Sequence, residues 1–166
     1  MNNTTIDGFC SNQSSAKKTR TVDELYRWCE FAAFTQVYTL CDIDTLLSKK
    51  SELNDTMKYK ILGQFAHLHA RLLEYIKIVE KEAILIGLPV LRPLFMQFPN
   101  DTQSWTVKYQ YMLGDSLMIA PVLKKNVKNW KVWLPAGSWQ HLWSNSEYSS
   151  RGQFITVFAP VGRPPI

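Results

Sequence analysis

Cysteine and histidine are scarce in this sequence, and neither forms a recognisable site. Cys10, Cys29 and Cys41 are an odd number for disulfide pairing, and none of them has the C-x-x-C spacing of metal ligands. His67 and His69 are two residues apart on an expected helix, so they lie on different faces and do not chelate one ion by themselves. We therefore expect no disulfide framework, no metal site and no cofactor.

Long apolar runs are absent as well. No run approaches the roughly 18 residues that a membrane span requires, and the N-terminus lacks the apolar segment of a signal peptide. The chain as written is therefore expected to be cytoplasmic, without a membrane span. If the N-terminus is incomplete, entry into the secretory pathway is the alternative. Five N-x-S/T sequons would then be candidate glycosylation sites: Asn2, Asn3, Asn12, Asn54 and Asn100.

The charge balance does not favour a nucleic-acid partner. Nineteen Lys and Arg against fourteen Asp and Glu give a net charge of +5. The tightest basic groups are residues 17–20, which contain no aromatic residue, and 124–131, which contain only Trp130, so neither has the repeated aromatic interleaving of a nucleic-acid platform. We interpret the basic residues as a solvated surface and expect no nucleic-acid partner.

The N-terminal half has the pattern of helices. Thr21 and Glu24 form a capping box that predicts a helix over about residues 22–34. Residues 34–40 are a short, mostly apolar run that is compatible with a strand. From Met57 apolar residues recur every three or four positions, which predicts a helix of about 30 residues ended by Gly87.

The C-terminal half has the pattern of short strands. Pro89 and Pro93 exclude a helix interior, so residues 90–98 are expected to be a buried, strand-like segment before a turn at Pro99. Alternating and β-branched runs bounded by turn residues predict further strands at about 117–122, 130–134, 139–143 and 153–158.

Three linked motifs around this junction resemble glycoside hydrolase family 31. They are G-L-P-V-x-R-P-L-F at 87–95, F-P-x-D at 98–101, and Y-Q-Y-M-L-G-D-S-L-M-I-A-P-V at 109–122. Residues 24–28 with 33–35 are similar to the family's E-L-x-x-R-W…A-F-T-P segment, although Gln36 replaces its proline. Residues 133–139 resemble Y-L-P-x-G-x-W, and 159–165 resemble A-P-x-x-x-x-P. The segments 113–117 and 161–165 are similar to the sulfoquinovosidase and bacterial α-glucosidase branch.

The resemblance implies an α/β part followed by a β part. Residues 1–88 would be the C-terminal remnant of a (β/α)8 catalytic barrel, with two helices. Residues 89–166 would be the junction and an antiparallel β-sandwich, the proximal C-terminal domain, truncated. An open remnant of a barrel is expected to expose apolar surface and to self-associate.

The resemblance also implies the chemistry of a retaining α-glycosidase acting on a carbohydrate. Two carboxylates about 5–5.5 Å apart perform that reaction, one as nucleophile and one as acid and base. In the family both aspartates precede the segment matched here. We therefore expect no catalytic residue in this chain and no turnover by the chain alone.

Few substrate-binding positions of the family are kept. Phe9 aligns with the aromatic residue that lines the glycone subsite, but it is equally interpretable as a buried or interface aromatic. Thr5 replaces an aspartate of the same motif. Cys41 stands where the family has a histidine that donates to sugar hydroxyls, and a neutral thiol is a weak donor.

Three other groups of residues have structural interpretations that we prefer. Arg92 is expected to be buried at the seam between the two parts, where it needs a carboxylate or several carbonyls, and Asp115 is a candidate partner. The tryptophans 133, 139 and 143 could form a sugar platform but are expected to be packed. Asp42, Asp44 and Glu82 show no sign of forming a new catalytic pair.

Two hypotheses about function follow. The chain is either part of an α-glycosidase of family 31 or a non-catalytic sugar-binding or protein-interaction module derived from that family. The altered positions Thr5 and Cys41 favour the second, because truncation alone would leave the remaining motifs intact.

Overall fold

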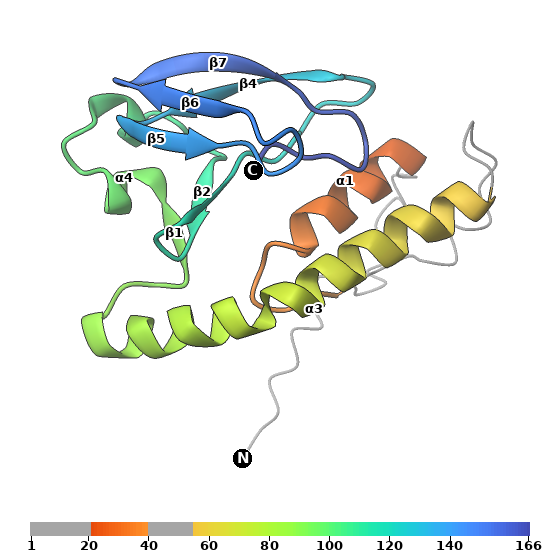
Figure 1. Ribbon diagram of the computed structural model, residues 1–166, viewed down its shortest axis with the longest axis horizontal. Coiled ribbons are helices and arrows are strands. Elements are labelled where there is room, and N and C mark those ends of the chain that lie inside the picture. The colour runs from red at the N-terminus through yellow and green to blue at the C-terminus, as the bar shows by residue number, and fades with distance from the viewer. Residues whose placement is uncertain (1–20, 40–54) are drawn as a thin grey trace, which may run out of the picture.

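The computed structural model describes residues 21–39 and 55–166, in which two helices lie along one side of short antiparallel strands (Figure 1). The helices are α1 (Val22–Ala32) and α3 (Asp55–Ile86). A short helix α4 (Leu94–Gln97) and a 3-10 helix η2 (Thr102–Trp105) follow. The strands are β1 (Leu91–Pro93), β2 (Tyr111–Leu113), β3 (Leu117–Ile119), β4 (Asn129–Leu134), β5 (Gly137–Gln140), β6 (Glu147–Ser150) and β7 (Gln153–Phe158).

Both expected helices are confirmed, with the termini that their sequences encode. The Thr21 hydroxyl accepts from the Glu24 N–H at 3.3 Å, and the Glu24 carboxylate accepts from the Thr21 N–H at 2.7 Å. These two bonds complete the capping box of α1. Helix α3 stops before Gly87, whose φ of +72° is a conformation that glycine adopts without steric cost.

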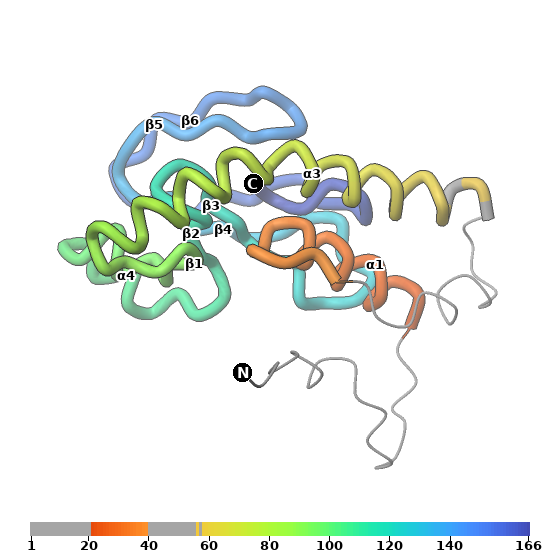
Figure 2. Tube along the Cα trace, turned by 90° about the horizontal axis from the view of Figure 1, so that it is seen from below, coloured from red at the N-terminus to blue at the C-terminus, as the bar shows by residue number. Residues whose placement is uncertain are grey.

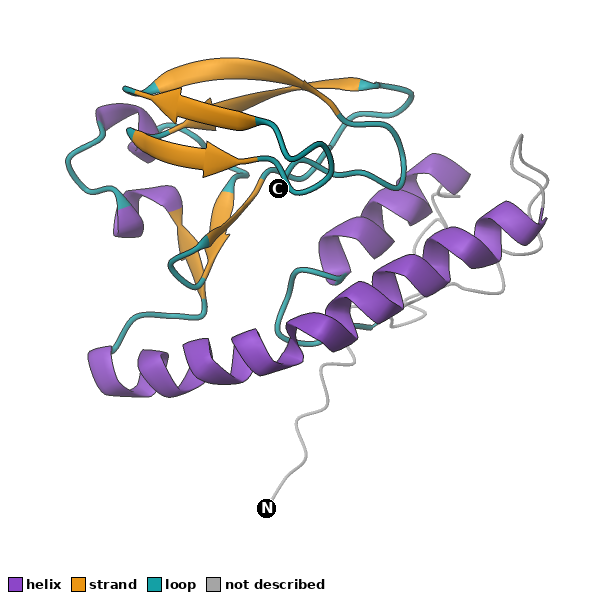
Figure 3. Cartoon of the chain, in the orientation of Figure 1, coloured by secondary structure: helices purple, strands orange, loops and turns teal. Residues whose placement is uncertain are grey.

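The expected strand over residues 34–40 is wrong for the part that the structure describes. After α1 the chain turns through Phe34 to Val37 and forms no strand up to residue 39 (Figure 3). The Thr35 hydroxyl lies 2.8 Å from the Ala32 carbonyl and 2.8 Å from the Val37 carbonyl. Local bonds of this kind compete with extended structure, and among the described strands none pairs with this segment.

The strand-like segment expected over residues 90–98 is also only partly right. Strand β1 ends at Pro93, and Leu94 begins the one-turn helix α4. Proline has no N–H to donate to a neighbouring strand, and Pro93 is also the residue that precedes the first turn of α4, so the chain leaves the ladder here. The sequence pattern predicted that Leu94 is buried, which the structure confirms, but it did not predict this change from strand to helix.

The remaining strands form three antiparallel groups. Strands β1, β2 and β3 make one sheet in that order, β4 pairs with β7, and β5 pairs with β6. The expected strands at 117–122, 130–134 and 153–158 are found as β3, β4 and β7, and the expected strand at 139–143 begins two residues earlier as β5. Strands β2 and β6 were not predicted, since one is three residues long and the other is largely polar.

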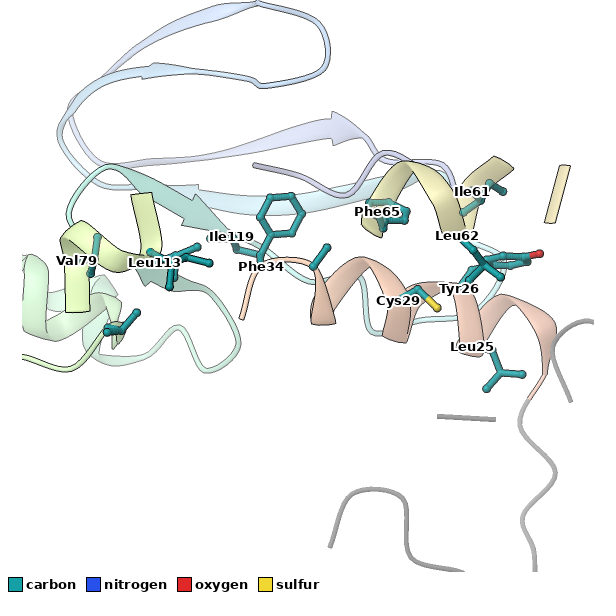
Figure 4. Close-up of a cluster of buried hydrophobic side chains, with 13 residues drawn as sticks. Leu25, Tyr26, Cys29, Phe34, Ile61, Leu62, Phe65, Val79, Leu113 and Ile119 are labelled. Atoms are coloured by element: carbon teal, nitrogen blue, oxygen red, sulfur yellow. The ribbon is translucent and has the colours of Figure 1, made fainter. Parts of the chain in front are cut away.

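Two apolar clusters hold these layers together. The first lies between the helices and the first sheet, where Tyr26, Phe34, Phe65 and Leu113 are almost completely buried (Figure 4). The second lies inside the strand-rich part and is centred on Met112, Trp133 and Val157 with their neighbours. The helices are therefore packed onto the β part by a continuous core rather than tethered to it.

Candidate functional site

Of the residues singled out from the sequence, only some lie in the described ranges. Phe9, the candidate substrate contact, lies outside them, as do Thr5 and Cys41. Asp42 and Asp44 lie outside them too. Arg92, Asp115, Glu82 and the three tryptophans can be placed.

Arg92 is buried at the seam where α3 passes into the first sheet. The residue is 1% exposed, its Nε donates to the Pro89 carbonyl at 2.9 Å, and its Nη1 donates to Gln97 Oε1 at 3.3 Å. Its Nη2 forms an ion pair with Glu82 Oε1 at 3.6 Å. Arg92 thus connects α3, the junction and α4, although its Nη2 makes no hydrogen bond and interacts with Glu82 through charge alone.

The partner of Arg92 is Glu82 rather than Asp115. Asp115 is exposed in the turn between β2 and β3, and its Oδ1 accepts from the Ser116 hydroxyl at 2.6 Å. In the same turn the Tyr75 hydroxyl of α3 donates to the Leu113 carbonyl at 2.7 Å. Gly114 has a φ of +66°, and an added Cβ would meet the Tyr75 hydroxyl and lie 2.6 Å from a methyl carbon of Val79. This turn is therefore a second contact between α3 and the sheet.

A buried ion pair on α1 makes the third contact. Arg27 and Glu30 are 8% and 2% exposed, and Arg27 Nη1 lies 2.9 Å from Glu30 Oε2. Arg27 Nη2 donates to the carbonyls of Val127 at 3.1 Å and Ala159 at 2.9 Å. Glu30 Oε1 accepts from the Gly162 N–H at 2.6 Å. Burial raises the pKa of Glu30, and the Arg27 charge and the Gly162 N–H oppose that rise.

The burial of Arg27 and Glu30 was not predicted from the sequence. A charged pair three residues apart on a helix usually lies on a solvated face. The sequence does contain a signal, because Leu25, Tyr26 and Cys29 around the pair are apolar. All three are buried in the structure. A charged pair set among such neighbours indicates burial.

The three tryptophans are packed, as expected. The Trp133 indole donates to Asp101 Oδ2 at 2.7 Å, that of Trp139 to the Pro135 carbonyl at 2.9 Å, and that of Trp143 to the Pro164 carbonyl at 2.6 Å. Trp133 belongs to the second apolar cluster, and Trp139 packs against it. A row of stacking faces for a sugar is therefore not formed by these residues.

Asp101 is the centre of a small network beside α4. Its Oδ1 accepts from the Gln103 N–H at 3.0 Å, and its Oδ2 accepts from the Ser104 hydroxyl at 2.7 Å as well as from Trp133. Partial burial alone would raise the pKa of Asp101, but the hydrogen bonds from Ser104, Trp133 and Gln103 outweigh it and lower that pKa. This carboxylate therefore has a structural role at the start of η2.

The described residues do not assemble a metal centre or a membrane span. Over 21–39 and 55–166, no three His, Cys, Asp or Glu side chains lie close enough to hold an ion. Within the same residues, no helix is long and apolar enough to cross a bilayer.

Known proteins resemble this chain over both its helices and its strands. The model of the glycosyl hydrolase family 31 C-terminal domain matches residues 87–166, from the end of α3 onward. The chain belongs to glycoside hydrolase family 31. The three motifs read from the sequence all begin within this matched segment.

Relatives in family 31 extend the match into the helices. The sulfoquinovosidase of Escherichia coli is 32% identical over 89% of this chain, and that of Agrobacterium fabrum is 34% identical over 89%. The structure of a family 31 sulfoquinovosidase from E. rectale is similar over 92% of the chain, with a TM-score of 0.80 and 32% identity. A family 31 α-xylosidase from a soil metagenome gives a TM-score of 0.75 over 87% of the chain at 29% identity.

The chain is much shorter than these family 31 proteins. It spans 21% of the E. coli sulfoquinovosidase and 22% of that of A. fabrum. In the two solved structures it corresponds to 23% and 24% of the respective chains.

Proposed function

We propose that this chain supplies the last helices of the catalytic barrel and the proximal C-terminal domain of a retaining α-glycosidase. Residues 1–88 would belong to the barrel and residues 89–166 to the junction and the domain. The observation that carries the proposal is the continuous match to sulfoquinovosidases across both parts, from the helices to the strands. The substrate of this enzyme would be a carbohydrate that contains an α-glycosidic bond.

The role proposed for the described residues is to support the barrel rather than to react. Arg27 and Glu30 fix α1 to the ends of the β part, and Arg92 fixes the end of α3. An active site needs its reacting groups held to a fraction of an ångström, which depends on such supporting contacts. We propose that these seam residues keep the end of the barrel in place.

The reacting carboxylates themselves would lie outside this sequence. Retaining hydrolysis needs two carboxylates about 5–5.5 Å apart, one ionised and one protonated. By the family resemblance both precede the segment present here. We therefore propose that the chain does not hydrolyse glycosides by itself.

A hybrid enzyme tests the proposed role of the C-terminal domain. The segment of the E. coli sulfoquinovosidase that matches residues 87–166 is replaced by those residues, and hydrolysis of a sulfoquinovoside is measured beside the parent enzyme. We expect a folded hybrid with measurable hydrolysis, because residues 87–166 match the model of the family's C-terminal domain. A hybrid that has the parent's melting temperature but no activity would contradict the proposal that residues 87–166 support the barrel as the parent's own domain does.

The altered positions Thr5 and Cys41 support a second candidate, a non-catalytic sugar-binding or protein-interaction module. A second hybrid that takes residues 1–166 distinguishes the two. If the presence of Thr5 and Cys41 prevents substrate binding, the hybrid with residues 1–166 loses hydrolysis, whereas the hybrid with residues 87–166 keeps it. Restoring aspartate at position 5 and histidine at position 41 would then recover activity.

A further inference from the structure

Strand β7 (Gln153–Phe158) has an open edge. Its one neighbour among the described strands is β4, and together they make a sheet of two strands. In Figure 1, β7 lies on the side of the strands away from α1 and α3, and Figure 2, seen from below, shows α3 crossing in front of the strands. A two-stranded sheet is marginally stable by itself, and an open edge is a template for pairing with a further strand.

The hydrogen bonds of Trp133 on β4 show which backbone groups of β7 face this edge. The Trp133 N–H donates to Gln110 Oε1 at 2.7 Å, and the Trp133 carbonyl accepts from Gln110 Nε2 at 2.8 Å, so both groups point away from β7. Phe154 lies opposite Trp133, and in an antiparallel pair the backbone groups alternate between the partner strand and the outer edge. The N–H and C=O groups of Phe154, Thr156 and Phe158 therefore point to the open edge of β7.

The two outer edges of the β4 and β7 sheet differ. The side-chain amide of Gln110, a residue that is 8% exposed, covers the edge of β4 at Trp133, where it donates and accepts as a neighbouring strand would. Apart from β4, no described helix or strand packs along β7. Phe154 is 44% exposed, Phe158 is 59% exposed, and Thr156 between them is exposed as well. The edge of β7 is thus accessible from solvent.

The sequence of β7 lacks the features that normally protect an edge strand. Its six residues, Q-F-I-T-V-F, include no proline, no glycine and no charge. Natural edge strands are usually protected by lysine, proline or a bulge. All the residues of β7 except Gln153 are aromatic or β-branched, which favours extended structure and pairing. The open edge is therefore suited to accept another strand.

The order of the outward residues selects a second copy of the same strand as the partner. Phe154, Thr156 and Phe158 have the same order of residue types in both chain directions. An antiparallel copy centred on Thr156 therefore places Phe154 opposite Phe158 of the second copy, and the two Thr156 residues opposite each other. All of these positions would exchange both backbone hydrogen bonds, and aromatic pairs and Thr–Thr pairs stabilise neighbouring strands. The edge is self-complementary, as a two-fold interface requires.

The charge of Lys131 on β4 does not oppose this pairing. Its Nζ lies 4.2 Å from the ring centroid of Phe154, and Lys131 is opposite Thr156 in the register of β4 and β7. In the paired copies the two Lys131 residues would be three strand spacings apart, or about 14 Å. That distance exceeds the Debye length of about 8 Å at physiological ionic strength. Salt therefore screens most of the repulsion between them.

We propose that β7 is the interface of a two-fold homodimer of this chain. The two sheets join edge to edge into one antiparallel sheet in the order β4, β7, β7, β4, with the two-fold axis at Thr156. The joined sheet then has a size that is common in globular proteins. The proposal goes beyond the function proposed above, since it concerns assembly and requires neither a barrel nor catalytic carboxylates.

Amide hydrogen exchange, followed by NMR beside sedimentation velocity, tests the interface residue by residue. The 166-residue chain carries Ile84→Glu and Leu85→Glu, because these residues of α3 are 84% and 83% exposed and offer a separate apolar surface. In a sample with the mass of a dimer, we expect the outward amides of Phe154, Thr156 and Phe158 to exchange at least about tenfold more slowly than after dilution to monomer. The inward amides of β7 should exchange slowly in both samples. Fast exchange of the outward amides in the dimer, or a monomer mass at the highest concentration, would overturn the proposal.

Substitutions in the same background locate the interface on β7. Thr156→Pro removes an outward N–H without removing a bond to β4, a change that edge strands tolerate, and it should raise the dimer dissociation constant at least about a hundredfold. Phe158→Glu keeps every backbone group and should raise it at least about tenfold. The matched control Thr156→Val retains the N–H and the shape of the side chain, and should change it by at most about threefold. Thermal melting shows whether each variant is folded. If the folded variants Thr156→Pro and Phe158→Glu dimerise as the control does, β7 is not the interface.

Discussion

At the residue scale, the decisive feature is a charged pair where charge is costly. Arg27 and Glu30 are nearly inaccessible, yet each finds additional partners in backbone groups of the β part. Removing one member of such a pair leaves the other charge buried and uncompensated, which costs much more than an exposed pair is worth. The pair therefore couples the helices to the strands energetically.

The first prediction concerns Glu30. Glu30→Ala should lower the free energy of unfolding by about 3 kcal/mol, because Arg27 and the Gly162 N–H lose their buried partner. Urea denaturation followed by circular dichroism measures this change. The matched control is Glu74→Ala, which breaks an exposed pair of the same spacing with Lys77 and should cost at most about 0.5 kcal/mol. Equal effects of the two substitutions would refute the coupling.

The second prediction concerns pH and Asp101. Hydrogen bonds hold its pKa below the ordinary value of 3.8, so the folded state favours the ionised form. The resulting stability is present above pH 3.8 and is lost as the pH falls through the lowered pKa. The difference in unfolding free energy between the unaltered chain and Asp101→Asn should therefore shrink as the pH falls from 6 toward 3. Tryptophan fluorescence during urea unfolding, with Trp133 as an adjacent reporter, measures it; a constant difference would contradict the assignment.

At the element scale, local signals in the sequence predicted the helices much better than the strands. The capping box of Thr21 and Glu24 and the stop at Gly87 act within a few residues, so they can be read directly. Strands β2 and β6 exist because a neighbour pairs with them, and neither has a long alternating run of its own. Residues 34–40 show the converse, an apolar run for which no described strand provides a partner.

The candidate site, too, was predicted only in part from the sequence. Burial of Arg92 follows from its apolar neighbours, but its partner Glu82 lies ten residues earlier on α3 and was not the one expected. The hollow lined by Trp28, Tyr109 and Leu123 was not predicted, because these residues come together only through the packing of α1 on the loops. Pairings of this kind depend on tertiary geometry that residue spacing does not encode.

The third prediction concerns the turn between β2 and β3. Gly114→Ala should destabilise the chain by about 2 kcal/mol or more, because an alanine is strained at a φ of +66° and its Cβ would collide with Tyr75 and Val79. Gly63→Ala is the control, since it lies within α3 with no atom within 4 Å of the added Cβ. That substitution should stabilise the helix by about 0.5–1 kcal/mol. Thermal unfolding of both variants compares them, and a harmless Gly114→Ala would show that α3 does not approach this turn.

At the scale of the whole molecule, α3 presents apolar side chains to solvent near its C-terminus. Ile84 and Leu85 are 84% and 83% exposed, and Ile78 is 64% exposed. Several large apolar side chains exposed near one end of a helix indicate a surface that another part of a protein covers. In the proposed function this surface would contact other parts of a larger glycosidase.

The fourth prediction is that the purified 166-residue chain self-associates through this surface. Sedimentation velocity should show an average mass that rises with protein concentration, and the double substitution Ile84→Glu, Leu85→Glu should reduce that rise. Leu123→Glu, which alters an exposed apolar residue after β3, is the matched control and should have a smaller effect. A concentration-independent monomer of the unaltered chain would contradict the prediction.

The central claim is that these residues support glycoside hydrolysis without performing it, and a direct assay of the purified chain tests it. Enzymatic accelerations of roughly 10⁶-fold and more depend on reacting groups, which we propose lie outside this sequence. With p-nitrophenyl α-D-glucopyranoside, we predict that release of p-nitrophenol equals the buffer rate at every chain concentration. Saturable release that copurifies with the 19.2 kDa chain would contradict the account, because the chain would then contain its own acid and nucleophile.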